Sequence, residues 1–213
     1  MTGLTIGEKH TYLDFGLKML SYTISPPEPK IEDIDVPGMN EPLDVSEFFG
    51  EILYKRRKLT ATFDMEEQDS NTFFERFSEL CNYMHGLTKK IIPDDDSIYY
   101  YEGRIKVSYE RKNALFYGIT ISADVAPYKM RLEETVISHD VSKELEVVLR
   151  NNRKSVIPTI ITDSEFRLSF NGKSATHSAG EFIIPALKLT ETETVVTCYG
   201  TGNITFKYRE GSL

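Results

Sequence analysis

Apolar and polar residues alternate one by one along most of this chain, and this pattern limits its fold more than any other feature. Successive side chains of a strand point to opposite faces, so a period of two marks a strand with one buried face. The pattern recurs in seven stretches, which are 59–65, 104–109, 117–125, 145–149, 166–170, 195–199 and 204–208. Short strands at this spacing are typical of β-sandwiches and barrels. The sequence therefore predicts a mainly β protein.

Turn signals separate several of these stretches. Asn171-Gly172 follows an alternating run and is the strongest short hairpin signal. Residues 110–113 also predict a hairpin turn. Residues 31–36 form a short strand candidate that ends at Pro37-Gly38, and the three prolines in 25–30 predict an extended entry to it.

One segment has a helical period instead. Its apolar residues recur at spacings of three and four, and they are Phe73, Phe74, Phe77, Leu80, Cys81 and Met84. Thr72 and Glu75 fit a capping box at its start, and Gly86 suits the left-handed position just past its end. We expect a single helix that packs on a sheet through this apolar face.

The alternation stops at 126–128, and we expect a domain boundary in 127–135. This predicts two β-rich domains, residues 1–130 and residues 131–213. No repeat relates the two halves.

Charge and composition exclude several classes of protein. The 33 acidic and 25 basic residues give a net charge of −8, which argues against broad nucleic-acid binding because that relies on Lys and Arg. A 40 % share of hydrophobic residues is too high for a disordered chain. The polar start and the lack of a long apolar run predict a soluble, non-exported chain. Cys81 and Cys198 exclude a disulfide framework and favour two separate buried thiols.

No catalytic motif is present. The four histidines, His10, His85, His139 and His177, lack zinc-ligand spacing, and no nucleophile elbow, phosphate loop or dinucleotide fingerprint occurs. Asp94–Asp96 lacks the ligand spacing of a calcium loop, so we expect a solvated loop there. The sequence therefore predicts no catalytic residue, no cofactor and no metal, and it favours a binding or assembly protein over an enzyme.

Two clusters leave alternatives open. Lys55-Arg56-Arg57-Lys58 would split two and two between opposite faces if it lies in a strand, so a charged hairpin flank or a protein interface is favoured over a nucleic-acid site. Tyr99-Tyr100-Tyr101 could form a sugar-binding platform in a chain that has no Trp, but sheet packing explains it equally well.

A set of ordered motifs nevertheless matches a known family. They are Asp14-Phe15-Gly16-Leu17, 24–30, Asp35-Val36-Pro37-Gly38, 43–46, 50–57, 80–86, Asp94-Asp95, 99–104, 200–202 and 208–213. Through their order and spacing the chain resembles the distal tail protein (Dit) family of siphophages that infect Gram-positive bacteria.

The resemblance implies a particular architecture and role. It implies an N-terminal ring-forming domain related to tail-tube subunits, which is a β-sandwich with one helix and an extended hairpin. It also implies a C-terminal galectin-like β-sandwich. Six copies would form a homo-hexameric ring at the tail tip of the virion after synthesis in the host cytoplasm. The ring would join the tail tube protein to the tail-associated hub protein, with the tape-measure protein as a further partner and no membrane. DNA would only pass through the central channel.

The resemblance also directs attention to an arm and its flanks. The candidate interface residues are Asp35, Val36, Pro37, Gly38, Tyr54, Lys55, Arg56 and Arg57, and 31–59 is the candidate arm that reaches a neighbour. A solvated loop within one subunit is the alternative. Met39-Asn40-Glu41-Pro42 replaces the family's basic residue and Asp-Gly, so this turn must be built differently. If part of the acidic surplus lines the channel, like charge would let DNA pass without sticking.

Three other functions remain open beside the tail-tip role. The chief alternative is a tail module that binds cell-wall saccharides of the host, although the C-terminal half lacks an inserted module for that purpose. A tail-tube subunit comes next, and a wall hydrolase is the least favoured.

Overall fold

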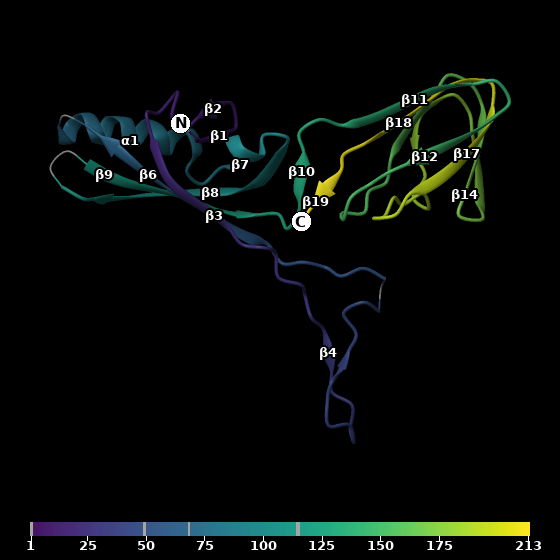
Figure 1. Cartoon of the computed structure of the whole chain (residues 1–213), viewed down its shortest axis with the longest axis horizontal. Helices are drawn as coiled ribbons and strands as arrows, with labels where there is room; N and C mark the ends of the chain where they lie inside the picture. The colour runs from purple at the N-terminus through teal and green to yellow at the C-terminus, as the bar shows by residue number, and fades with distance from the viewer. Residues whose placement is uncertain (1, 49, 68, 114–115) are drawn as a thin grey trace. The chain divides into compact units, whose positions relative to one another are not determined.

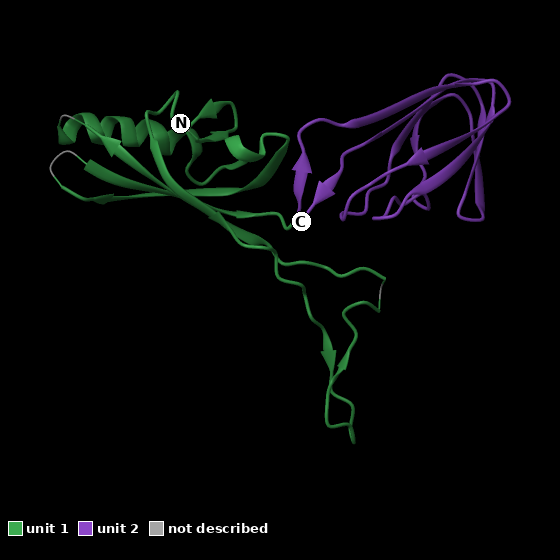
Figure 2. Ribbon diagram, viewed as in Figure 1, with its two compact units in different colours: residues 1–127 green, residues 128–213 purple. Residues whose placement is uncertain are grey.

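The computed structural model describes residues 2–48, 50–67, 69–113 and 116–213, and the chain forms two compact units (Figure 2). Unit 1 comprises Met1–Pro127 and unit 2 comprises Tyr128–Leu213, so the division lies at 127/128 where the sequence placed it at 130/131. Each unit contains its own apolar core. The protein is mainly β, as predicted, with a single α-helix among the described residues.

Unit 1 is built on one antiparallel sheet (Figure 1). Seven strands of the described residues follow the order β2-β1-β7-β8-β9-β6-β3. Their bounds are β1 Leu4–Ile6, β2 Lys9–His10, β3 Lys18–Ile24, β6 Arg57–Glu66, β7 Thr88–Pro93, β8 Tyr99–Arg111 and β9 Phe116–Val125. A short 3-10 turn, η1 (Asp94–Asp96), separates β7 from β8.

The alternation in β6 shows why one face of this sheet is buried. Leu59, Ala61 and Phe63 are fully buried, whereas the residues between them are partly exposed. The expected second sheet of a sandwich is not what covers this face in the described residues. Helix α1 (Ser70–Met84) packs there instead, since its own apolar side chains supply the opposing layer.

The α1 interface is aromatic. The Phe73 ring stacks on Tyr117 of β9 with centroids 3.5 Å apart and meets Tyr109 of β8 edge-on at 5.3 Å. Leu80 and Met84 are also fully buried. The predicted apolar face is therefore largely confirmed, except that Phe74 is 47 % exposed.

The cap of the helix lies three residues before the predicted one, since Asp69 and not Thr72 occupies the N-cap position. The side chain of Asp69 accepts hydrogen bonds from the backbone N–H groups of Asn71 and Thr72, and the Thr72 hydroxyl also donates to it. These bonds lower the pKa of the Asp69 carboxyl below its ordinary value, since they favour the charged form. The predicted capping box at Thr72 is therefore wrong, because Asp69 caps the helix. Gly86 has φ of +78° just past the helix end, as predicted.

Unit 2 consists of two four-stranded antiparallel sheets that enclose one core. The first sheet has the order β11-β18-β13-β16, with β11 Thr135–Val141, β18 Gly202–Tyr208, β13 Thr159–Thr162 and β16 Gly180–Ile183. The second has the order β12-β17-β14-β15, with β12 Glu144–Leu149, β17 Thr194–Gly200, β14 Phe166–Phe170 and β15 Lys173–His177. Strand β10 (Lys129–Arg131) pairs with β19 (Gly211–Ser212). In the chain, β10 comes before β11 and β19 comes after β18.

Two turn predictions have different outcomes. Asn171 and Gly172 both have positive φ, 47° and 71°, and they join β14 to β15 as a tight hairpin should. The hairpin predicted at 110–113 begins later, because β8 continues to Arg111. Part of that turn, residues 114 and 115, lies outside the described residues.

The two cysteines are free and belong to different units. Cys198 is fully buried in β17, and burial raises the pKa of its thiol to about 12. Cys81 is only half-buried at the edge of the α1 core, which differs from the expectation of two buried thiols. In the described part of the chain, no helix is long and apolar enough to cross a bilayer.

Candidate functional site

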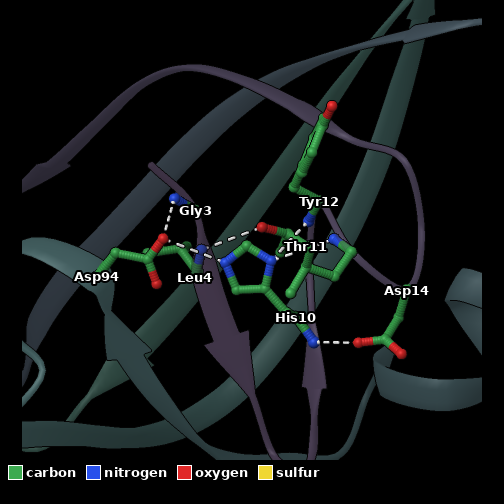
Figure 3. A network of polar contacts seen from close by, with 8 residues as sticks. Gly3, Leu4, His10, Thr11, Tyr12, Asp14 and Asp94 are labelled. Carbon is green, nitrogen blue, oxygen red and sulfur yellow. Dashed lines mark hydrogen bonds and ion pairs between the residues drawn. The ribbon is translucent and has the colours of Figure 1, made fainter. Parts of the chain in front are cut away.

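The densest polar network of unit 1 surrounds His10 (Figure 3). The Nδ1 atom of His10 accepts hydrogen bonds from the backbone N–H groups of Tyr12 and Leu13 at 3.2 and 3.1 Å. The proton of the neutral ring therefore sits on Nε2, which donates to Asp94 Oδ2 at 3.2 Å. The same carboxylate oxygen accepts from the backbone N–H of Gly3 at 2.7 Å.

This His–Asp pair has a structural arrangement. The nearby hydroxyl of Thr11 is fully buried and accepts a hydrogen bond from the backbone N–H of Leu4, so it is not placed as a nucleophile. The network instead ties the β1–β2 hairpin to η1, which is 84 residues away from His10 in the chain. The sequence predicted a solvated loop at Asp94–Asp96. In the structure, Asp94 is instead held by hydrogen bonds to Gly3 and His10.

The neighbouring Asp95 also holds a partner. Its carboxylate accepts a hydrogen bond from the Tyr22 hydroxyl at 2.7 Å. Burial and this hydrogen bond raise the pKa of the Tyr22 hydroxyl. Among the residues that the structure describes, no three His, Cys, Asp or Glu side chains are grouped as a metal site would need. The acidic run therefore stabilises the fold of unit 1 through Gly3, just before β1, and through side chains of β2 and β3.

The tyrosine cluster does not form a binding platform. Tyr100 and Tyr101 are only 7 % and 6 % exposed, because β8 places both within the folded unit. Of the two readings left open by the sequence, sheet packing is the one that the burial of these rings favours. The alternative of a tail module that binds host saccharides through the C-terminal half stays a prediction.

The most unusual feature of unit 1 is the connection between β3 and β6, which leaves the sheet as a long excursion (Figure 1). We call residues 26–54 the arm. Its two limbs are joined by Lys30 N–H to Leu53 C=O at 2.7 Å, and by a bridge between Pro29 and Tyr54. Further out, β4 (Asp33–Ile34) pairs with β5 (Leu43–Asp44) as a separate two-stranded ribbon. The predicted arm of 31–59 therefore extends too far at its end, since Leu59 belongs to the buried face of β6.

The arm exposes large apolar side chains to solvent. Every residue from Glu28 to Asp44 is exposed. The large apolar residues among those exposed on the arm are Ile31, Ile34, Val36, Met39, Leu43, Phe48 and Leu53. Large exposed apolar surface on a protein is typical of interaction sites, so the arm is the candidate site. The sequence signal that could have found them is the absence of any periodicity that would assign one face to a core.

The predicted interface residues fall in two places. Asp35, Val36, Pro37 and Gly38 form the turn beyond β4, where Met39 N–H donates to Val36 C=O at 3.1 Å. Tyr54 and Lys55 lie at the base of the arm, where Lys55 is 3.3 Å from the Glu28 carboxylate. The ribbon between tip and base separates these two groups.

The remaining two predicted residues show the split between faces. Arg56 donates to the backbone carbonyl of Asp124 at 3.2 Å and is exposed. Arg57 points the other way and is only 7 % exposed, with its guanidinium 4.9 Å from the ring centroid of Tyr101. In the described residues its Nε and Nη2 have no hydrogen-bond partner, and burial lowers its pKa. Arg57 is therefore buried at the start of β6, where the arm joins the sheet, and does not belong to an accessible surface.

The acidic surplus of the chain is concentrated in the arm. Residues 26–54 contain eight carboxylates and one lysine, a net charge of −7 out of −8 for the whole chain. The acidity therefore belongs to a protruding segment, whereas the sheet and unit 2 are nearly neutral together. The expectation that part of this negative charge lines a DNA channel stays a prediction.

Comparison with known proteins gives one informative result. No family model and no curated protein matches the sequence. Among solved structures, the chain is similar to the Dit protein of phage SPP1, described as a paradigm of the hub adsorption apparatus in phages that infect Gram-positive bacteria. The TM-score is 0.68 at 11 % sequence identity, and the match covers 98 % of this chain and 99 % of the other. The chain therefore has a Dit-like fold over its whole length.

Proposed function

We propose that the protein is a structural component of a phage tail tip, where it forms a ring of six copies that joins the tail tube to the hub and adsorption apparatus. The observation that carries this proposal is the shared fold with the SPP1 Dit protein across both units. The ordered sequence motifs support it independently. A protein of this role needs extensive contact surfaces and no catalytic centre.

The arm supplies the kind of contact that a ring requires. A closed ring is built from head-to-tail contacts, in which one surface of a subunit meets a different surface of the next. An arm with exposed apolar residues that reaches the neighbouring copy fits this demand, because its apolar side chains leave water on assembly. The exposed backbone of the β4–β5 ribbon can also pair with a sheet edge of the neighbour.

The two units then have separate tasks. Unit 1 forms the ring and contacts the tail tube protein, and DNA passes through the central channel. Unit 2, which we propose to be a galectin-like sandwich, lies towards the hub protein and the adsorption apparatus. A galectin-like fold does not by itself imply that the unit binds sugars.

The position of the protein in the particle tests this role. An antibody raised against the chain, coupled to gold and applied to phage particles from the strain that carries the gene, should label one end of the tail. Label along the whole tail would instead indicate a tail-tube subunit. Particles that carry no label, while the denatured particles also lack the chain on a blot, would overturn the proposed function.

A further inference from the structure

The face of the unit 1 sheet opposite α1 has an ordered polar pattern. Strand register places Ser21, Thr62, Thr120 and Ser108 in one row across β3, β6, β9 and β8. The next row contains Thr23, Thr60, Ser122 and Lys106. Seven of these eight side chains carry a hydroxyl group, and Lys106 is the one that is charged.

The end of this face nearest the arm is basic. Lys58 and Arg104 both lie opposite Asp124 in register, on either side of β9. Lys106 follows one row further, 3.6 Å from the Asp124 carboxylate. We call Lys58, Arg104 and Lys106 the basic face. All three are exposed. Asp124 lies between them, and Glu102 precedes Arg104 on the same face with Lys90 opposite it in register, so positive charge is in excess.

The arm carries the opposite charge in an arrangement that favours an external cation. Asp33 of β4 lies directly opposite Asp44 of β5 in register. Like charges at directly opposed positions destabilise a strand pair. Hydrogen bonds from Ser46 lower the pKa of Asp44, so this carboxyl stays charged at neutral pH. In the part of the chain that the structure describes, Glu32, Asp33 and Asp35 form no ion pair.

We infer that the acidic ribbon of the arm, centred on Asp33 and Asp35, docks on the basic face of the neighbouring copy of this chain. This inference rests on the proposed ring and names the surface that receives the arm. Lysine and arginine side chains of the neighbour would relieve the repulsion between the two opposed aspartates. The apolar residues of the arm, such as Ile34 and Leu43, would be buried in the same contact.

A second copy fits these charges better than other occupants do. Docking within one chain is disfavoured, because the arm leaves the sheet at the ends of β3 and β6 and its described ion pair is the one at its base, Glu28 with Lys55 (Figure 1). Duplex DNA would need many cations, whereas the two neighbouring rows of this face consist of hydroxyl residues apart from Lys106. Complementary charges on one chain also set the orientation of a head-to-tail contact.

Charge reversal on each side tests the inference in the full-length protein. Asp33→Lys with Asp35→Lys changes the arm, and Lys58→Glu with Lys106→Glu changes the basic face. Each pair should weaken self-association by about tenfold or more, as reversal of close charge pairs does. The chain that carries all four substitutions should recover most of the lost association, since the charges are then exchanged. Sedimentation equilibrium measures all three variants, and circular dichroism checks that each is folded.

A matched control separates this contact from a general effect of net charge. Lys143→Glu with Lys173→Glu changes two exposed lysines of unit 2 and should leave association as in the wild type. If the basic-face variant assembles normally, or if the four-fold variant is no better than its parents, the inference is overturned while the ring stands. A basic-face variant that assembles normally but loses retention of duplex DNA would assign this face to DNA and also overturn it. A wild-type chain that stays monomeric would overturn the proposed ring and this contact together.

Discussion

Replacement of the arm by a short linker is expected to leave the protein monomeric, in place of the proposed ring, while both units stay folded. The change would join Ile24 to Arg57 through a few Gly and Ser residues in place of the arm and its flanks. Such a hairpin can close, because Ile24 already lies opposite Leu59 in the β3–β6 register. A shorter loop also costs less closure entropy. Native mass spectrometry should give the mass of one chain, and the thermal unfolding midpoint should fall by no more than a few degrees.

A milder variant tests the apolar part of the same contact. Ile31→Ser with Met39→Ser removes two side chains that are 65 % and 56 % exposed, so the isolated subunit should be unaffected. Its association should weaken, because these side chains leave water on docking. The control is Val148→Ser with Val195→Ser, which changes two exposed residues that face each other on β12 and β17 of unit 2. A linker variant that still forms complete rings would show that the arm is only a solvated loop.

Phe73→Ala is expected to be the most destabilising single substitution in unit 1. The Phe73 side chain is fully buried. Its ring stacks on those of Tyr117 and Phe77, with ring centroids 3.5 and 5.7 Å apart. Removal of a buried Phe leaves a cavity and costs about 3–5 kcal/mol. Loss of the aromatic pairs adds to this cost. Urea denaturation should show the transition of unit 1 at a much lower midpoint, while that of unit 2 is unchanged.

The neighbouring residue provides the control. Phe74 is next in the helix but 47 % exposed, so Phe74→Ala should cost about 1 kcal/mol or less. Both variants replace a helical Phe by Ala, so the change in helix propensity is the same. The two differ in how deeply the removed side chain is buried. Equal destabilisation by both would contradict the packing of α1 on the sheet through Phe73.

The local pattern of the sequence predicts most of the strands. The alternation of Leu59, Ala61 and Phe63 is enough to identify β6, because its period is set by burial of one face. Asn171-Gly172 identifies its hairpin for the same local reason. The boundary of α1 was wrong because two capping candidates, Asp69 and Thr72, lie within one turn of each other. Propensity does not decide between two such residues.

The long-range features could not be predicted from local pattern. The bond from His10 to Asp94 spans 84 positions, and nothing near either residue indicates the other. The burial of Arg57 depends on Tyr101 of another strand. The charge of the arm, by contrast, could have been read directly from residues 26–54, since it needs only a count.

The mass of the purified full-length chain under native conditions tests the central claim most directly. We expect a closed ring whose mass is six times that of one chain of 24.4 kDa, visible as a ring with a central hole in negative stain. The arm explains why the ring should form without other tail proteins, because both partners of the contact lie on this chain. A strict monomer at high concentration, which also fails to associate with tail tube or hub protein, would contradict the account.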